Sequence, residues 1–240
     1  MSCNEKAGEF SREIQNMFTA IAPRYDFLNR LLSIGQDKYW RKVAVDTLAP
    51  GPNELILDIA TGTGDMLLEI ASRIDTTQIF GIDFSRRMLD LGRTKVIKKG
   101  YDRAVSFLIG SGECLPFADK SFDGAVCAFG IRNFSDARLG LMEFYRILKP
   151  GGRAVILEFS MPTNPALSHV YNWYFNLILP IIGSLVSKHN DAYNYLPESI
   201  IDFPDPKFFA SWIEDAGFQK VSFFNLSLGI VSIYRGYKIL

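Results

Sequence analysis

The sequence is poor in cysteine and histidine and has no excess of charge of either sign. Its three cysteines, Cys3, Cys114 and Cys127, form no CxxC pair, and its two histidines are His169 and His189. We therefore expect neither a disulfide framework nor a bound metal ion. Lys plus Arg and Asp plus Glu both number 26, so the net charge does not favour a nucleic-acid partner. These absences are typical of a cytoplasmic protein with reduced thiols.

The chain also lacks an apolar run long enough to cross a bilayer. Residues 1–13 are mostly polar, without the apolar centre of a secretory signal. The most apolar stretch, residues 173–186, contains Pro180 and Gly183 and is shorter than the ~20 residues that a spanning helix needs. This stretch predicts a buried helix, and the alternative is a helical wall that faces an apolar ligand or the membrane surface.

What the chain does have is a regular alternation of apolar, strand-like runs and helical segments. With 240 residues, of which 48% are hydrophobic, it has the size and composition of one α/β domain. Helical periodicity covers residues 8–49 and ends at the breaker Ala49-Pro50-Gly51-Pro52. Strands are then predicted at 55–59, 78–82, 104–109, 122–128 and 153–159, with helices at 65–73, 85–99 and 136–148 between them.

This alternation indicates a Rossmann-like α/β fold with a mostly parallel sheet. The tail adds a helix at 208–216, with Gly217 at its C′ position, and a closing antiparallel pair at 221–225 and 230–237. A C-terminal antiparallel strand is typical of class I methyltransferase sheets rather than of dehydrogenase sheets. In such sheets the ligand binds outside the carboxyl ends of the strands.

A glycine-rich turn joins the first predicted strand to the next helix. In Asp58-Ile59-Ala60-Thr61-Gly62-Thr63-Gly64-Asp65 the two glycines let the backbone approach a ligand without a Cβ in the way. The free N–H groups of the helix start favour a polar or anionic group. Dinucleotide binding wants a third glycine, where this chain has Leu67. S-adenosylmethionine has no pyrophosphate and needs less room, so the turn favours a methyltransferase cofactor.

Two later segments complete a predicted site for S-adenosylmethionine. Asp83 ends the second strand about 20 residues past the first glycine, where a carboxylate can accept both ribose hydroxyls. Ser111 follows the third strand, where its hydroxyl is expected at the adenine edge. Taken alone, the glycine turn is also typical of a turn that only serves packing, and Asp83 is also typical of an N-cap. The glycine turn, Asp83 and Ser111 in this order after successive strands predict a methyltransferase. The predicted cofactor-binding residues are Ala60, Gly62, Thr63, Gly64, Asp83, Phe84, Met88, Ser111, Gly112 and Phe129.

Two further motifs carry a resemblance to a known family. They are Tyr25-Asp26-Phe27-Leu28-Asn29 and Phe129-Gly130-Ile131-Arg132-Asn133, and shorter matches extend over nearly the whole chain. With them the sequence resembles the quinone-biosynthesis C-methyltransferases, which act on demethylmenaquinol and on the polyprenyl benzoquinol precursor of ubiquinone. The resemblance implies S-adenosylmethionine-dependent C-methylation of such a reduced quinone. It also implies a helical lid over 1–49, a Rossmann-like methyltransferase domain over 50–240, and a helical substrate-side insertion at 161–205.

The expected chemistry assigns roles to polar residues near the cofactor. Carbon methylation needs an electron-rich ring whose carbon is aligned with the methyl group, and it needs no metal ion or covalent nucleophile. Arg132 would stabilise the phenolate, and Asn133 would hold an oxygen or a water. The resemblance adds Asp65 and Tyr25 to this catalytic group, and it implies Asn29, Trp40, Tyr174 and Tyr195 as substrate-binding residues.

Structural roles for the same residues stay open at this point. Arg132 precedes Asp136 by four residues, a spacing that favours an ion pair on a helix. Tyr25 and Trp40 are also typical of core aromatics, and Asp65 of a first-turn acid favoured by the helix dipole.

Four positions depart from the family pattern. Asp37 and Tyr234 lie where His is usual, Ser111 replaces Asn, and Ala128 replaces Ser. They motivate an alternative, a methyltransferase that acts on oxygen or nitrogen of another apolar small molecule. A nucleotide-binding protein without catalysis and a dehydrogenase are further alternatives. For the quinone hypothesis we expect an apolar groove for the polyprenyl tail and transient contact with the inner membrane face, and a homodimer is left open.

Overall fold

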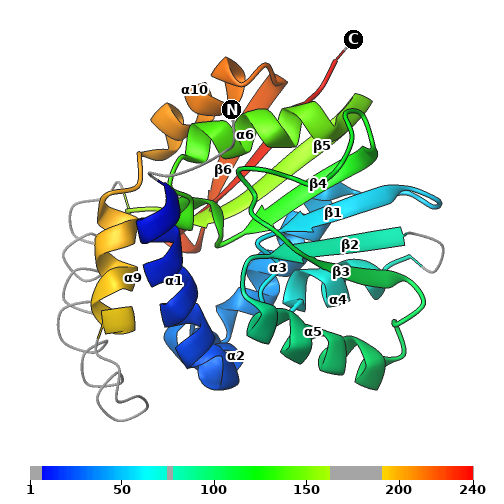
Figure 1. The fold of residues 1–240 in the computed structure, drawn as a ribbon. Helices are drawn as coiled ribbons and strands as arrows, with labels where there is room; N and C mark the ends of the chain where they lie inside the picture. The colour runs from blue at the N-terminus through cyan, green and yellow to red at the C-terminus, as the bar shows by residue number, and fades with distance from the viewer. Residues whose placement is uncertain (1–6, 75–77, 163–190, 240) are drawn as a thin grey trace.

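The computed structural model describes residues 7–74, 78–162 and 191–239. A seven-stranded sheet with the order β3-β2-β1-β4-β5-β7-β6 forms its centre (Figure 1). Strands β1 to β5 pair in parallel, whereas β7 pairs antiparallel with both β5 and β6. This arrangement confirms the predicted Rossmann-like fold with a C-terminal antiparallel strand. The strands are β1 Leu55–Ile59, β2 Gln78–Asp83, β3 Val105–Ile109, β4 Phe122–Ala128, β5 Leu148–Phe159, β6 Gln219–Leu226 and β7 Val231–Tyr237.

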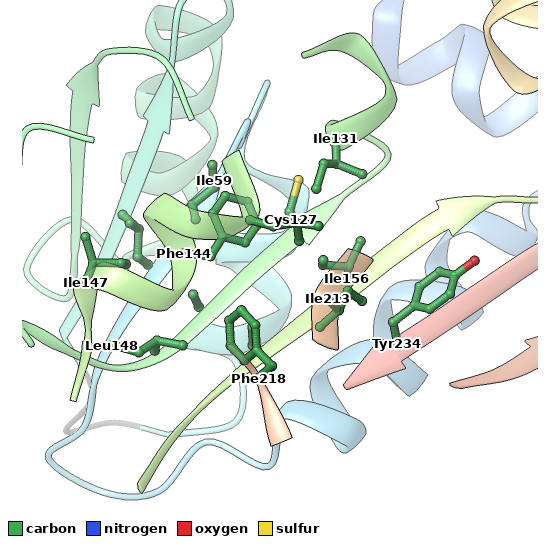
Figure 2. Packing of buried hydrophobic residues seen from close by; sticks show 14 of the residues in the cluster. Ile59, Cys127, Ile131, Phe144, Ile147, Leu148, Ile156, Ile213, Phe218 and Tyr234 are labelled. Carbon is green, nitrogen blue, oxygen red and sulfur yellow. The ribbon is translucent and has the colours of Figure 1, made fainter. Parts of the chain in front are cut away.

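Helices cover both faces of the sheet (Figure 1). On one face, Figure 2 shows Phe144 of α6 and Ile213 of α10 packed with Cys127 of β4 and Ile156 of β5. On the other face, α3 and α4 bury their apolar sides against β1 and its neighbours. Tyr234, one of the departures from the family pattern, is a fully buried member of the first of these cores (Figure 2). The helices are α3 Gln36–Leu48, α4 Asp65–Ala71, α5 Arg86–Lys99, α6 Ala137–Ile147 and α10 Pro206–Asp215.

The helix ends predicted from side-chain caps are confirmed. Ser85 begins α5 by accepting a hydrogen bond from Met88 N, and Asp136 begins α6 by accepting one from Leu139 N. Gly217, the predicted C′ residue of α10, has φ of +104°. These caps matter for the site because α5 and α6 both start at its edge.

The predicted start of the fifth strand is wrong. The Lys149-Pro150-Gly151-Gly152 segment predicted a turn before a strand at 153, but β5 already begins at Leu148. The segment continues the ladder because Gly151 N donates to Lys238 O and Lys238 N donates to Gly152 O, at 2.7 and 2.9 Å. Local turn propensity is overridden here by pairing with the C-terminal strand.

The N-terminal helices lie at the carboxyl edge of the parallel strands, beside α9 (Figure 1). Helix α1 packs against α5 and α9, and α9 in turn contacts η2. None of the helices in the described part of the chain is long and apolar enough to cross a membrane. These elements are α1 Ala7–Ile21, η1 Ala22–Arg24, α2 Tyr25–Leu32, η2 Ile131–Asn133 and α9 Asp191–Ile201.

Leu67 explains how α4 packs closely without the third glycine of a dinucleotide turn. Leu67 is fully buried, and its Cδ1 would lie 2.7 Å from a Cβ built on Gly81 of β2. The space that a helix glycine would provide is therefore provided by a strand glycine opposite. Helix α4 approaches β2 through a leucine that fills the gap above Gly81.

Gly81→Ala is expected to lower the free energy of unfolding by about 1–3 kcal/mol, because the new methyl group overlaps Leu67. In a Leu67→Ala background the same change should cost less, because the overlap with Leu67 is gone and only the contacts with Thr61 at 3.0 and 3.1 Å remain. Denaturant unfolding of the two single variants and the double variant measures this coupling. Gly51→Ala, where a Cβ meets nothing closer than 3.4 Å, is the matched control. Equal costs of Gly81→Ala in both backgrounds would refute this packing explanation.

Candidate active site

The turn after β1 has the backbone shape expected of a ligand-binding turn. Gly62 and Gly64 have φ of +55° and +80°, a left-handed conformation that favours glycine. Gly64 is the N-cap of α4. A Cβ built on Gly62 would lie 3.8 Å from the ring of Tyr25, so this residue of α2 lies directly over the turn.

Asp83 connects the end of β2 to the glycine turn. It is buried, and its carboxylate accepts hydrogen bonds from Gly62 N and Ser85 N, both at 2.8 Å. The N-cap of α5 is Ser85, so the N-cap role left open for Asp83 is wrong. Burial raises the pKa of Asp83 to about 6, and the two backbone donors only partly oppose this. The carboxylate keeps further acceptor capacity for hydroxyl groups.

All of the predicted cofactor-binding residues lie in the segments that end or follow β1 to β4. Because these four parallel strands are neighbours in the sheet, their carboxyl ends bring the residues to one edge. Met88 is buried in the first turn of α5, and Phe84 packs edge-on against Phe18 of α1. Ser111 donates to the carboxylate of Glu113 at 3.3 Å, so its contact with an adenine stays a prediction.

Arg132 and Asn133 belong to one partly buried polar network. Arg132 Nη1 donates to Glu158 Oε1 and to Phe129 O, both at 2.7 Å. Glu158, at the end of β5, is fully buried. The ion pair proposed with Asp136 is therefore wrong, because Asp136 caps α6 and a carboxylate from β5 takes its place. Burial alone would lower the pKa of Arg132, but the charge of Glu158, its hydrogen bond, and the nearby Tyr25 and Tyr195 together raise it.

The same network includes Tyr195, one of the predicted substrate-binding residues. Its hydroxyl donates to Asn133 Oδ1 at 2.9 Å, which turns Asn133 Nδ2 toward Phe129 O at 3.3 Å. Burial raises the pKa of Tyr195, and the Arg132 charge opposes this. Helix α9 thus contacts the segment 129–133 through the hydrogen bond of Tyr195 to Asn133.

Tyr25 lies over Gly62 of the glycine turn and interacts electrostatically with Arg132. Its pKa is raised by burial, while a hydrogen bond from Asn29 and the charges of Arg41 and Arg132 oppose the shift. Tyr25 and Asn29 therefore face the same side of α2, as their spacing predicted. The hydroxyl is placed near two cations, so it is suited to share a proton with a substrate oxygen.

Asp65 has a specific partner in addition to its place in the first turn of α4. Lys95 of α5 pairs with Asp65, with Asp26 Oδ2 at 2.8 Å and with Thr63 Oγ1 at 3.0 Å. Burial alone would raise the pKa of Asp65, but Arg41 and Lys95 lower it. Thr63 also donates to Asp26 Oδ1 at 2.5 Å. Through these contacts, Asp26 of α2 is connected to Thr63 and Asp65 at the glycine turn.

Trp40 lies in the core, as the packing alternative expected. It is buried against Phe129 and Phe159 at centroid distances of 6.0 and 6.1 Å, and its Nε1 donates to Ser227 Oγ at 2.8 Å. Its contact with substrate stays a prediction. Tyr174, and with it the apolar stretch 173–186, lies outside the described residues.

Sequence reasoning missed three charged residues of this site: Glu158, Lys95 and Arg41. Glu158 and Lys95 lie on elements distant in the chain from the residues that they contact. Arg41 pairs with Asp37 on its own helix, but no local spacing indicated that its guanidinium lies beside Phe129 at the end of β4. The one available signal was position, since Glu158 ends a predicted strand on the same edge as Asp83.

Asp58 of β1 has a carboxylate oxygen without a hydrogen-bond partner in the described part of the chain, close to the glycine turn. Its Oδ2 accepts from Thr61 Oγ1 at 2.5 Å, while its buried Oδ1 has no hydrogen-bond partner among the described residues. Burial raises its pKa to about 7. The cofactor's ammonium group fits a site with such an unpartnered carboxylate, because a cation nearby would favour the ionised form.

We expect S-adenosylhomocysteine binding near pH 7 to release protons, because its ammonium should lower the pKa of Asp58 from about 7. Affinity should then fall as the pH falls below that value. Calorimetry in buffers of different ionisation enthalpy measures the release, and Asp58→Asn should remove most of it. Equal proton release by wild type and Asp58→Asn would contradict this account.

No three His, Cys, Asp or Glu side chains within the described ranges are grouped as metal ligands. The sheet order, the glycine turn and the carboxylate at the end of β2 together define a class I methyltransferase, in which S-adenosylmethionine is the methyl donor. The chain belongs to the ubiE/COQ5 methyltransferase family, whose model matches residues 5–238. Membership confirms the predicted family, enzyme class and cofactor.

Relatives resemble the chain over its whole length. The "Ubiquinone/menaquinone biosynthesis C-methyltransferase UbiE" of Geotalea daltonii is 49% identical, covering 97% of this chain and 99% of its own. The "Demethylmenaquinone methyltransferase" of Deinococcus radiodurans is 45% identical, covering 94% and 92%. Both names agree with the C-methylation that the sequence predicted.

Solved structures are similar in fold. The [4+2]-cyclase SpnF superposes with a TM-score of 0.72 at 14% identity, covering 95% of each chain. A possible histamine N-methyltransferase from Thermotoga maritima gives 0.62 at 21% identity, covering 92% of this chain and 99% of its own. At such identities the likeness shows the fold alone, and the different chemistries named show why the reaction must be argued from the site.

Proposed function

We propose that the enzyme transfers a methyl group from S-adenosylmethionine to a ring carbon of a reduced polyprenyl quinone precursor, either demethylmenaquinol or the benzoquinol of the ubiquinone pathway. The observation that carries the proposal is the partly buried network of Arg132, Glu158, Asn133 and Tyr195, with Tyr25 within electrostatic reach of Arg132. It provides a fixed cation and neutral hydrogen-bonding groups next to the cofactor turn. The names of the relatives support the same substrate class.

The proposed reaction uses the residues as follows. S-adenosylmethionine supplies an electrophilic methyl group. Arg132 stabilises the phenolate oxygen of the quinol, while Tyr25 and Asn133 hydrogen-bond the oxygen or a water that takes its proton. The electron pair of the adjacent ring carbon forms the new C–C bond, and sulfur keeps the pair of the broken C–S bond. The ring carbon then loses its proton to solvent through that water, which restores the aromatic ring.

The N-terminal helices act as a lid in this proposal. Gln15 Nε2 donates to Phe84 O at 2.5 Å, the Thr19 and Ser85 hydroxyls are 3.1 Å apart, and Asp26 accepts from Thr63. Each contact connects α1 or α2 to a segment that would surround the cofactor. Excluding water there would strengthen the interaction of Arg132 with a phenolate.

The test of the proposal is transfer of label from methyl-labelled S-adenosylmethionine to reduced and to oxidised demethylmenaquinone. We expect a methyl group on a ring carbon with the reduced form only, because the oxidised ring is not nucleophilic. A methyl group on oxygen would support the alternative O-methyltransferase. Cofactor binding without transfer to either quinol class would overturn the proposal.

Peripheral contact with the inner membrane face is part of the proposal, because a polyprenyl substrate resides in the bilayer. Phe27, Leu31 and Ile34, at helical spacing on α2 and its end, are 60%, 41% and 83% exposed. We expect the variant Phe27→Ser/Leu31→Ser/Ile34→Ser no longer to float with phosphatidylglycerol vesicles in a density gradient. A variant at the equally exposed Ile97 and Met142 is the control. Unchanged flotation of the α2 variant, or a wild type that stays unbound, would contradict membrane contact through α2.

A further inference from the structure

Arg41 of α3 is a buried cation whose guanidinium is only partly occupied. Its Nη1 donates to Asp37 Oδ2 at 2.8 Å and to Asp37 O at 3.4 Å. No described residue accepts from its Nε or Nη2, yet neither atom is sealed in the interior. The residue as a whole is 8% exposed. Two donor groups of a nearly buried arginine therefore face an opening.

The position of Arg41 places that opening at the cofactor edge. Its guanidinium carbon lies 5.6 Å from the ring centroid of Phe129, the residue that follows β4. Next along the chain, a Cβ on Gly130 would lie 2.5 Å from Ala60 Cβ, so the ends of β4 and β1 meet here. Strand order reverses between β1 and β4, and ligands of such sheets bind in the crevice at this point.

The charges around Arg41 leave it available to an anion. Asp37 also pairs with Arg30 at 2.7 Å, so one carboxylate is shared by two guanidinium groups and this cluster keeps one positive charge. The other cations of the site are already matched, Lys95 with Asp26 and Asp65, and Arg132 with Glu158. Arg132 also has an Nε without an acceptor among the residues that the structure describes, but its charge is matched by a carboxylate of its own, Glu158. Arg41 shares the single charge of Asp37 with Arg30.

The field of Arg41 reaches the turn itself. Burial acts to raise the pKa values of Asp65 and Asp58, and the charge of Arg41 opposes this effect at both carboxyl groups. These two carboxylates suit the ammonium group of an amino acid. The amino-acid end of S-adenosylmethionine carries a carboxylate as well, and this second group needs a cation close to the first.

We propose that the guanidinium of Arg41 binds the α-carboxylate at the methionyl end of the cofactor, and that Asp37 positions it for that contact. Arg41 would then be a specificity-determining residue, which favours the intact cofactor over its decarboxylated form. A planar fork suits a carboxylate better than a point charge does. The inference rests on the cofactor and is independent of which acceptor the enzyme methylates.

The test is calorimetric titration of S-adenosylhomocysteine and of its decarboxylated analogue into wild type and Arg41→Gln. We expect the variant to bind S-adenosylhomocysteine roughly 10- to 100-fold more weakly, the range for one charged hydrogen-bonded contact. Its Kd for the decarboxylated analogue should change by less than about threefold. Arg30→Gln, at the other arginine on Asp37, should leave both Kd values near those of wild type.

A similar loss for both ligands would show that Arg41 acts only through packing, and no loss for either would show that it does not touch the cofactor. Either result would overturn the proposal. If Arg41→Gln melts at a much lower temperature than wild type, the same two titrations are carried out with Arg41→Lys, which keeps the charge. It should lose affinity for S-adenosylhomocysteine and not for the analogue. No quinol is used, so a failed methylation assay leaves this result unaffected.

Discussion

Arg132→Met is expected to lower kcat by about 100- to 1000-fold and the free energy of unfolding by about 3–5 kcal/mol. The catalytic loss follows from removing the cation that is proposed to stabilise the phenolate. The loss of stability follows because Glu158, fully buried and paired with Arg132 at 2.7 Å, would be left charged without a partner. Steady-state methylation of a quinol and denaturant unfolding measure the two effects on the same samples.

A double variant separates the two effects. In Arg132→Met/Glu158→Met the pair is replaced by apolar side chains of similar size, which often restores or exceeds the original stability. The double variant should therefore regain stability but remain as inactive as Arg132→Met. If activity returned together with stability, Arg132 would have a structural role alone and the proposed phenolate contact would be wrong.

Asp83→Ala is expected to raise the Kd of S-adenosylhomocysteine by at least about 100-fold, because two ribose hydroxyls lose a carboxylate acceptor. The variant should stay folded near neutral pH. The substitution removes the hydrogen bonds from Gly62 N and Ser85 N, which lowers stability. It also removes the cost of keeping a buried carboxylate ionised near neutral pH, which offsets part of that loss. Calorimetry of wild type, Asp83→Ala and Asp83→Asn measures the effect, and a Kd within about threefold of wild type would exclude the ribose contact.

The pH dependence of stability provides an independent check on Asp83. Its pKa is raised from 3.8 to about 6 in the folded state, so its contribution to stability is complete below about pH 4 and is lost as the pH rises through 6. The shift corresponds to about 3 kcal/mol. The difference in unfolding free energy between wild type and Asp83→Asn should therefore move against the wild type as the pH rises from 4 to 7. A difference that does not change with pH would contradict the raised pKa.

The sheet and the cofactor edge were predictable because their signals are local. Each parallel strand contains an apolar run, and the helices that follow β2 and β4 begin at side-chain caps, Ser85 and Asp136. Once the strands alternate with helices, their carboxyl ends must lie on one edge. Asp83 and the glycine turn could therefore be brought together before any coordinates were known.

The partners of the charged residues were not predictable, because they depend on sheet register and helix packing. Helical spacing suggested Asp136 as the ion-pair partner of Arg132, whereas the observed partner is Glu158 on β5. Glu158 lies close to Arg132 because β4 and β5 pair in a register that places Ala128 opposite Leu157. Arg41 and Lys95 enter the site from α3 and α5 in the same way. Leu67 gave a correct argument against a dinucleotide site, but only the packing on β2 showed that Gly81 provides the missing space.

The most direct measurement of the central claim is a crystal structure of the enzyme with S-adenosylhomocysteine. The ribose hydroxyls should bind Asp83, the homocysteine part should lie over Gly62 and Gly64, and the adenine should lie beside Gly112. The sulfur should point toward the space between Tyr25 and Arg132. A nucleoside bound elsewhere, or one whose sugar makes no contact with Asp83, would contradict the account.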